Sequence, residues 1–259
     1  MKRFAVIGNP IKHSKSPQIF TYWFEQMKIS AKYYHLELDK NIDVSTFKAY
    51  LQNLTGANIT APFKHLAYLM ADKKDEIAQA TQAVNTIINN NGILYGYNTD
   101  VYGVKYALTD IVFDRVLVLG AGKAATAAIY TLVLQRKKIG VFNRTMSNAS
   151  KIINLYNYNN LSYIDKDDFN IFNPDLIINT IPDNQFVKSI VKNHLDLFAN
   201  TYFLNAIYPM PSYVKLLNTN KYIRGEYWLI GQAISNFQLF TRKKLPSTLE
   251  TKVFELILE

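Results

Sequence analysis

The feature that most constrains the fold is a glycine turn near the middle of the chain. An apolar segment, residues 115–119, runs directly into the turn at 120–122, and residues 123–134 follow as an apolar stretch of helical length. A strand, a glycine turn and a helix in this order are typical of the βαβ unit that binds a dinucleotide, with the pyrophosphate at the helix N-terminus. Because more than a hundred residues precede the turn, we expect a separate part of the chain to hold the substrate and the chemistry.

The residues around the turn favour NADP as the dinucleotide. Gly120 permits the tight turn, Gly122 lets the backbone approach the pyrophosphate, and Ala125 replaces the third glycine of the pattern. The next predicted strand is followed by Asn143-Arg144-Thr145, without the Asp or Glu with which an NAD site binds the ribose 2′-hydroxyl. Arg144 can instead bind a 2′-phosphate through charge-assisted hydrogen bonds. The alternatives are a glycine turn of another α/β protein and an ordinary surface arginine.

The order of the predicted elements divides the chain into two α/β domains. Strands that alternate with helices predict a mostly parallel sheet in an N-terminal substrate-binding catalytic domain, residues 1–101. A Rossmann-type NADP-binding domain is predicted over residues 102–229. Helices within 230–259 are expected to pack back on the first domain, and the active site is expected in the cleft between the two domains.

Local patterns give bounds to some of these elements. Ser16-Pro17 predicts a helix start with Ser16 as the N-cap, and Asn90-Asn91-Gly92 predicts a hairpin between strands at 84–89 and 93–95. A long helix is predicted over 99–111. The predicted strands of the second sheet are 115–119, 138–142, 161–164, 176–179 and 202–206.

The composition excludes several classes of function. With no cysteine among 259 residues, disulfides and thiolate-bound metal centres are excluded, and four scattered histidines give no support to a metal site. The formal net charge is +9, but the lysines are dispersed, so we expect anionic small molecules as partners and not nucleic acid. No Tyr-x-x-x-Lys pattern occurs, which argues against short-chain dehydrogenase chemistry.

The apolar segments are too short for a membrane protein. No stretch reaches the length of a transmembrane helix, and the apolar run at the N-terminus is too short for a signal peptide. We therefore expect a cytoplasmic protein without a membrane partner.

Seven short motifs together resemble those of the shikimate dehydrogenase family. They occur in the family's order over almost the full length of the chain. The resemblance implies two α/β domains and the NADP-dependent interconversion of 3-dehydroshikimate and shikimate in the pathway to chorismate and the aromatic amino acids. The motifs lie at residues 8–17, 58–64, 83–86, 96–103, 143–145, 208–209 and 231–232.

The resemblance implies that Lys64 and Asp100 form the catalytic pair. Reduction of a ketone needs a hydride from the nicotinamide and a proton for the oxygen, and a lysine ammonium beside that oxygen can stabilise the charge and donate the proton. Asp100 can orient Lys64 or hold a substrate hydroxyl. From the residues alone, a solvated surface group is the alternative for Lys64, although its place just after a predicted strand favours a functional role, and a helix cap is an equally good interpretation of Asp100.

The resemblance also implies two sets of binding residues. Serine hydroxyls are expected to bind the substrate carboxylate, and neutral side chains the ring hydroxyls, because unpaired buried hydroxyls are costly. The expected substrate-binding residues are Ser14, Ser16, Thr60, Lys64, Asn85, Asp100, Tyr208 and Gln232. The expected cofactor-binding residues are Gly120, Ala121, Gly122, Lys123, Ala124, Asn143, Arg144, Thr145, Thr180, Ile207 and Gly225.

Two positions depart from the family pattern. Lys123 stands where the family has a small residue, and Asn205 stands where the family tends to have Asp. Both departures concern cofactor affinity and not the class of reaction. The alternatives are a quinate/shikimate dehydrogenase that uses NAD, which Arg144 disfavours, and a ligand-sensing relative without turnover, which the retention of Lys64 and Asp100 disfavours. A monomer or a homodimer is expected.

Overall fold

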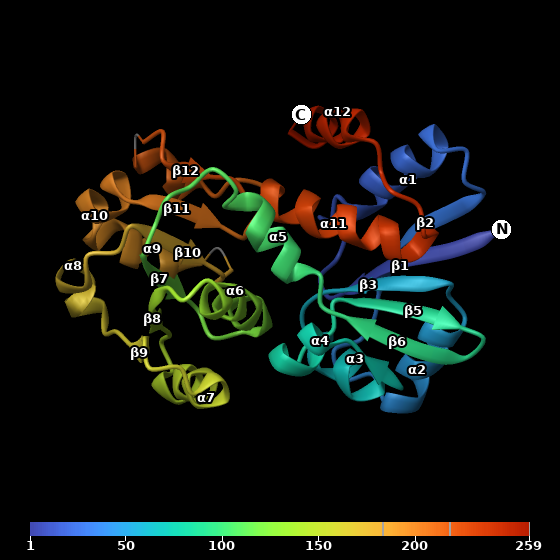
Figure 1. Ribbon diagram of the computed structural model, residues 1–259, viewed down its shortest axis with the longest axis horizontal. Coiled ribbons are helices and arrows are strands. Elements are labelled where there is room, and N and C mark those ends of the chain that lie inside the picture. The colour runs from blue at the N-terminus through green and yellow to red at the C-terminus, as the bar shows by residue number, and fades with distance from the viewer. Residues whose placement is uncertain (183, 218, 259) are drawn as a thin grey trace. The chain divides into compact units, whose positions relative to one another are not determined.

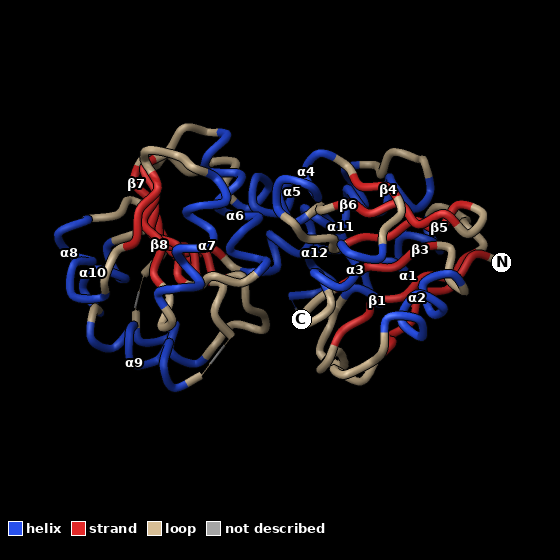
Figure 2. Tube along the Cα trace, turned by 90° about the horizontal axis from the view of Figure 1, so that it is seen from below, coloured by secondary structure: helices blue, strands red, loops and turns tan. Residues whose placement is uncertain are grey.

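The computed structural model describes residues 1–182, 184–217 and 219–258 (Figure 1). The chain forms two compact units, one made of Met1–Tyr102 with Ile230–Glu259 and the other of Gly103–Leu229. The boundaries between the units fall inside two helices, α5 (Asp100–Ala107) and α11 (Gly225–Thr241). In each unit the strands form a central layer with helices on either side (Figures 1 and 2).

The first unit is built on a mixed sheet with the strand order β2-β1-β3-β5-β6-β4. Strand β1 is parallel to β2 and β3, as predicted, and β4 is parallel to β6. Strand β5 is antiparallel to both of its neighbours, and the predicted hairpin joins it to β6. The strands are β1 (Lys2–Gly8), β2 (Ala31–Glu37), β3 (Gly56–Ile59), β4 (Lys73–Lys74), β5 (Thr86–Asn90) and β6 (Ile93–Tyr97).

The two faces of this sheet carry different cores, because successive side chains of a strand point to opposite faces. On one face Phe4 packs against aromatic rings of α1 and α11, with ring centroids 5.4 Å from Phe24 and 4.5 Å from Phe240. On the other face Ala5 and Ile7 join the buried cluster formed with α2, α3 and α4. The remaining helices of the unit are α1 (Ser16–Gln26), α2 (Val44–Gln52), α3 (Lys64–Met70), α4 (Glu76–Thr81) and α12 (Ser247–Leu258).

The start of α1 differs from the prediction by one position. Lys15 occupies the cap position without a side-chain cap hydrogen bond, and Ser16 is already the first helical residue. The hydroxyl acceptor comes from Ser14 instead, whose Oγ accepts the backbone N–H of Ser16 at 3.3 Å. The prediction of Ser16 as the N-cap was therefore wrong, and Pro17, predicted as the first helical residue, is the second.

The second unit is built on a parallel sheet with the strand order β12-β11-β10-β7-β8-β9. The five predicted strands all form, and β9 and β11 end one residue earlier than predicted. The strands are β7 (Arg115–Leu119), β8 (Lys138–Phe142), β9 (Leu161–Tyr163), β10 (Leu176–Asn179), β11 (Tyr202–Asn205) and β12 (Tyr222–Ile223).

Helices cover both faces of the second sheet. One buried cluster joins α5, α6, α7 and the start of α11 to one face, and another joins α8, α9 and α10 to the other. Helix α5 ends at Ala107 and not near residue 111. The helices are α6 (Lys123–Leu134), α7 (Met146–Tyr156), α8 (Phe169–Phe172), α9 (Gln185–Asn193) and α10 (Leu195–Asn200), with 3₁₀ turns η1 (Lys166–Asp168) and η2 (Ser212–Leu216).

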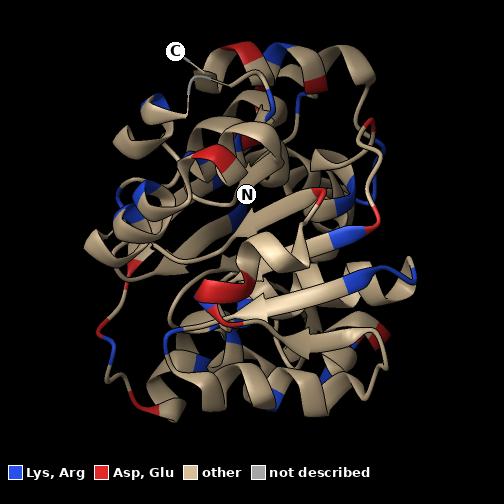
Figure 3. Cartoon of the chain, turned by 90° about the vertical axis from the view of Figure 1, so that its left-hand side faces the viewer, with Lys and Arg blue, Asp and Glu red and all other residues tan. Residues whose placement is uncertain are grey.

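The charged residues are spread over the structure. In the view of Figure 3, lysines and arginines alternate with acidic residues on helices and loops and do not gather into a band. Within the described residues, no helix combines the length and the apolar character needed to cross a membrane.

Candidate active site

The topology of the first sheet brings four loops to one edge. The carboxyl ends of the parallel strands β1 and β3 lie together, and the backbone N–H of Thr60 donates to the Ile7 carbonyl at 2.9 Å. Because β5 is antiparallel to β3, its beginning lies at the same edge, where Ile59 N–H donates to the Asn85 carbonyl at 2.7 Å. The end of β6 returns to that edge and leads into Asp100. Residues far apart in the sequence are thereby gathered at the edge where α/β sheets usually bind ligands.

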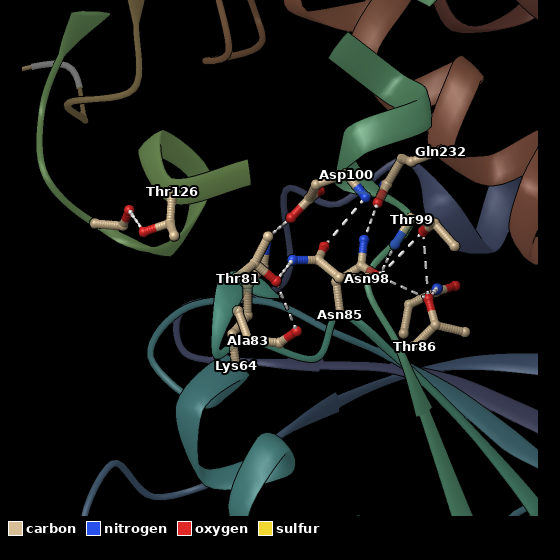
Figure 4. A network of polar contacts seen from close by, with 12 residues as sticks. Lys64, Thr81, Ala83, Asn85, Thr86, Asn98, Thr99, Asp100, Thr126 and Gln232 are labelled. Atoms are coloured by element: carbon tan, nitrogen blue, oxygen red, sulfur yellow. Dashed lines mark hydrogen bonds and ion pairs between the residues drawn. The ribbon is translucent and has the colours of Figure 1, made fainter. Parts of the chain in front are cut away.

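Lys64 and Asp100 meet at this edge in a buried ion pair (Figure 4). Lys64 is the first residue of α3 and Asp100 the first of α5. The Lys64 ammonium donates to a carboxylate oxygen of Asp100, and the two side chains are only 14% and 6% exposed. A solvated surface lysine would not be buried against a carboxylate, so the surface interpretation of Lys64 is wrong.

A buried amide supports the turn that carries Asp100. Asn98 is 0% exposed, and its Nδ2 donates to the Thr81 hydroxyl at 2.8 Å, at the end of α4. Its Oδ1 accepts the backbone N–H of Asp100 at 3.3 Å. Asn98 thus accepts a backbone N–H of the first turn of α5, and the Asp100 carboxylate bonds to Lys64 (Figure 4). Asn98 was not selected from the sequence, although it lies within the 96–103 motif.

Asn85 and Gln232 come together in the same unit. Asn85 is 1% exposed, and its Nδ2 donates to Gln232 Oε1 at 2.9 Å (Figure 4). The Asn85 Oδ1 accepts the backbone N–H of Thr99 at 2.8 Å and the Thr99 hydroxyl at 3.0 Å. These contacts fix which way the Asn85 amide faces, so its NH₂ group lies on the Gln232 side.

Of the two serines expected to bind a carboxylate, Ser14 lies in the loop between β1 and α1, and Ser16 is the first residue of α1. Ser14 and Ser16 are buried, at 9% and 4% exposure. The ring nitrogen Nε2 of His35, on β2, lies 2.9 Å from the Ser14 carbonyl and holds this loop against the sheet. Thr60 follows β3, next to the loop, whereas Tyr208 belongs to the second unit and is not part of this arrangement.

The glycine turn of the second unit forms as predicted. Gly120 follows β7 with φ +109°, a conformation that favours glycine. A Cβ at Gly120 would lie 2.4 Å from the hydroxyl of Thr180, which itself donates to the Leu119 carbonyl at 2.9 Å. Gly122 is the N-cap of α6, and a Cβ there would meet nothing within 4 Å. The space above Gly122 and the free N–H groups of α6 fit a pyrophosphate.

The turn also lies where the order of strands in the sheet reverses. Strand β7 has β10 on one side and β8 on the other, so the connections leave it in opposite directions. Ligands of open α/β sheets bind outside the carboxyl ends of the strands at such a point. The turn at Gly120, Thr180 after β10 and residues 143–145 after β8 all follow carboxyl ends at this place.

Arg144 lies in the segment that follows β8. Its guanidinium is exposed and lies 5.7 Å from the centre of the Phe186 ring, which stacks on Phe142. Asn143 closes the turn, since its Nδ2 donates to the Thr145 carbonyl at 2.9 Å. Among the described residues Arg144 forms no ion pair, so its charge is available to an anion.

The other residues predicted to bind cofactor differ in what they can offer. Lys123 begins α6, and partial burial lowers the pKa of its ammonium. Ala121 and Ala124 are partly buried and pack on the core. Gly225 is pressed against the 205–207 backbone, where a Cβ would lie 2.6 Å from the Asn205 carbonyl, and Ile207 N–H lies 3.3 Å from Asn205 Oδ1.

Asn205 is part of a buried neutral network. Its side chain is 0% exposed, accepts from Asn179 Nδ2 at 3.0 Å and donates to the Tyr213 hydroxyl at 3.1 Å. An aspartate at this position could accept the hydrogen bond from Asn179, but it has no N–H group to donate to the Tyr213 hydroxyl. Within the described residues, no group of three or more histidine, aspartate or glutamate side chains could hold a metal ion.

Gly120→Ala is expected to lower the free energy of unfolding by about 1–3 kcal/mol, because it strains the backbone at φ +109° and also brings a methyl group against Thr180. Gly92→Ala is a matched control, since Gly92 has φ +87° and a methyl group added there would meet nothing within 4 Å. Thermal and denaturant unfolding of both variants test this. An equal loss of stability in both would show that the contact with Thr180 has no effect.

Comparison with known proteins identifies two matching family models. The model described as the shikimate dehydrogenase substrate binding domain matches residues 6–87. The model described as shikimate / quinate 5-dehydrogenase matches residues 104–194. The two matches fall in the first and second structural units, respectively.

Relatives and solved structures match over nearly the whole chain. A shikimate dehydrogenase (NADP(+)) of Methanosphaera stadtmanae is 34% identical, over 92% of this chain and 91% of the relative. One of Pelagibacter ubique is 32% identical, over 99% and 98%. The crystal structure of shikimate dehydrogenase from Aquifex aeolicus has a TM-score of 0.86 at 27% identity, over 97% of both chains. Shikimate 5-dehydrogenase from Thermus thermophilus, in complex with NADP(H) and shikimate, has a TM-score of 0.83 at 26% identity, over 97% and 98%.

Proposed function

The chain belongs to the shikimate dehydrogenase family, and we propose that it interconverts 3-dehydroshikimate and shikimate with NADP, using Lys64 and Asp100 as the catalytic pair. The observation that carries this proposal is the buried ion pair of these two residues. It lies at the sheet edge that also bears Thr60, Asn85 and the loop of Ser14. The reaction belongs to the shikimate pathway, which leads to the aromatic amino acids.

Lys64 is the proton carrier of the proposed reaction. In the direction of reduction, NADPH supplies the hydride that reaches the carbonyl carbon, and negative charge develops on the carbonyl oxygen. The Lys64 ammonium stabilises that charge and donates a proton to the oxygen, which completes the alcohol. Lys64 is then neutral and regains a proton from solvent. The Asp100 carboxylate holds the ammonium in place, because the two are already bonded before substrate binds.

The remaining side chains at the edge suit a polyhydroxylated acid. The hydroxyls of Ser14 and Ser16 can donate to the substrate carboxylate, close to the N-terminus of α1, whose dipole favours an anion. Thr60, Asn85 and Gln232 offer neutral donors and acceptors for the ring hydroxyls. Tyr208, a residue of the second unit, is also proposed to bind the substrate.

The second unit is proposed to hold NADP at the carboxyl edge of its sheet. The pyrophosphate would lie against Gly120, Gly122 and the start of α6, with Lys123 beside it. Arg144 would bind the 2′-phosphate, with its guanidinium kept in place by the Phe186 ring. Strands that end at the same edge are followed by Asn143, Thr145 and Thr180. Two further residues, Ile207 and Gly225, lie near the end of β11.

The direct test is oxidation of shikimate by purified protein, followed by the absorbance of reduced nicotinamide. We expect reduction of NADP that depends on shikimate, and much slower reduction with quinate or NAD. Quinate is included because one matching family model also names it. Faster turnover with quinate and NAD would instead assign the quinate reaction, and tight shikimate binding without any turnover would assign a sensing role.

A further inference from the structure

A buried asparagine connects the chain neighbours of two site residues, although it is not itself one of the proposed substrate-binding residues. Asn236 is 0% exposed and lies on α11, one helical turn after Gln232. Its Oδ1 accepts from the Thr86 hydroxyl at 2.6 Å and from the Thr99 hydroxyl at 2.8 Å. Thr86 follows Asn85 in the chain, and Thr99 precedes Asp100.

The two threonine hydroxyls also lie close to a second oxygen, Asn85 Oδ1. Their hydroxyls lie 2.9 Å and 3.0 Å from Asn85 Oδ1, beside the backbone N–H of Thr99 at 2.8 Å. Asn58 Nδ2 also donates to the Thr86 hydroxyl, at 3.2 Å. Each hydroxyl thus lies within hydrogen-bond distance of both amides, but it has one proton and donates to one amide oxygen at a time.

We infer that Asn236 is a positioning residue, which ties the segment bearing Asn85 to the segment bearing Asp100 and so holds the Asn85 NH₂ toward the substrate. One oxygen on α11 bonds to a neighbour of each residue. The same helix contacts Asn85 directly through Gln232, at 2.9 Å. Two contacts one turn apart on a rigid helix restrain both position and rotation of the Asn85 amide.

Both orientations of the Asn236 amide connect the two threonines to α11. With Oδ1 toward the hydroxyls, Nδ2 is a buried donor without a partner among the described residues. With Nδ2 toward them, its two N–H groups donate to the hydroxyls while the hydroxyls donate to Asn85 Oδ1. The inference rests on the proposed shikimate activity and adds a residue that acts on the substrate through Asn85.

Asn236→Leu is the first test, and Asn236→Asp is its conservative partner because it keeps an acceptor oxygen. We expect Asn236→Leu to raise KM for shikimate by about 5- to 10-fold, as for the loss of about one hydrogen bond. Calorimetric titration with shikimate should show the same loss of affinity, while KM for NADP and the melting temperature stay close to those of the parent. Asn236→Asp should recover part of the affinity.

Thr99→Val and Ser235→Ala complete the experiment. Thr99→Val removes one hydroxyl of the same bridge, so its effect and that of Asn236→Leu should be less than additive in the double variant. Ser235→Ala is the control on the same helix, because within the described part of the chain the Ser235 hydroxyl bonds only to the Gly231 carbonyl, at 3.5 Å. Unchanged shikimate affinity in Asn236→Leu, or full additivity with Thr99→Val, would overturn the inference while parent turnover still upheld the proposed function.

Discussion

Lys64→Ala is expected to lower kcat for shikimate oxidation by about 10²–10⁴-fold, the usual contribution of a positioned acid–base group. The KM for shikimate should change far less, because the serines, Thr60, Asn85 and Gln232 remain to bind the ring. The Lys64 ammonium is buried in an ion pair with Asp100, so its removal deletes both the proton carrier and the positive charge next to the developing alkoxide. Steady-state kinetics with NADP in excess measures both constants.

Lys48→Ala is the matched control for this prediction. Lys48 also pairs with an aspartate of the first unit, Asp72, at 3.3 Å, but both side chains are 38% exposed. An exposed pair contributes little to stability, so this variant should keep the parent kinetics. Since Lys64→Ala leaves a buried carboxylate without its partner, the melting temperature is recorded with the kinetics. A folded Lys64→Ala protein with near-parent kcat would remove Lys64 from the chemistry.

Arg144→Ala is expected to raise KM for NADP by about 10- to 100-fold, the loss of charge-assisted hydrogen bonds to a phosphate. The KM for NAD should change little, because NAD lacks the 2′-phosphate that Arg144 is proposed to bind. The guanidinium is exposed and forms no ion pair among the described residues, so its removal leaves no buried charge behind. Kinetics with each cofactor, at saturating shikimate, gives the two constants.

Arg136→Ala is the control that separates a specific contact of Arg144 with the cofactor from a general change in the electrostatic potential of the protein. Arg136 is also exposed, but it precedes β8 and therefore lies at the opposite end of that strand from Arg144. Its removal changes the net charge equally and should leave both cofactor constants near the parent values. If Arg144→Ala weakened NADP and NAD to the same extent, the assignment of the 2′-phosphate to Arg144 would be wrong.

The sequence predicted the second sheet better than the first. Strands β7, β8, β10 and β11 are mostly apolar and buried on both faces, a pattern readable without tertiary information, whereas in β9 only Leu161 is buried. Strands β4 and β12 have only two residues each, too few to show a period, and they form because longer neighbours pair with them. The mixed order of the first sheet depends on which side of β3 the hairpin packs, which no local pattern encodes.

The pairing of the site residues could be inferred only through the family resemblance. Lys64 and Asp100 are 36 residues apart, and Asn85 and Gln232 are 147 apart, so only the fold brings them together. Asn98 and Thr99 lie inside a recognised motif but were not selected from the sequence. Asn236 lies four residues after Gln232 in a predicted helix, and that helical spacing was the one signal that could have placed it on the same face.

The proposed site can be tested by a crystal structure with shikimate and NADP bound. We expect the hydroxyl to be oxidised to lie within hydrogen-bond reach of Lys64 Nζ, about 2.6–3.2 Å away. We also expect the shikimate carboxylate at the hydroxyls of Ser14 and Ser16, and the 2′-phosphate of NADP at Arg144. A complex with the shikimate carboxylate on Lys64, or with the reacting hydroxyl out of reach of Lys64, would show that the proposed roles are wrong.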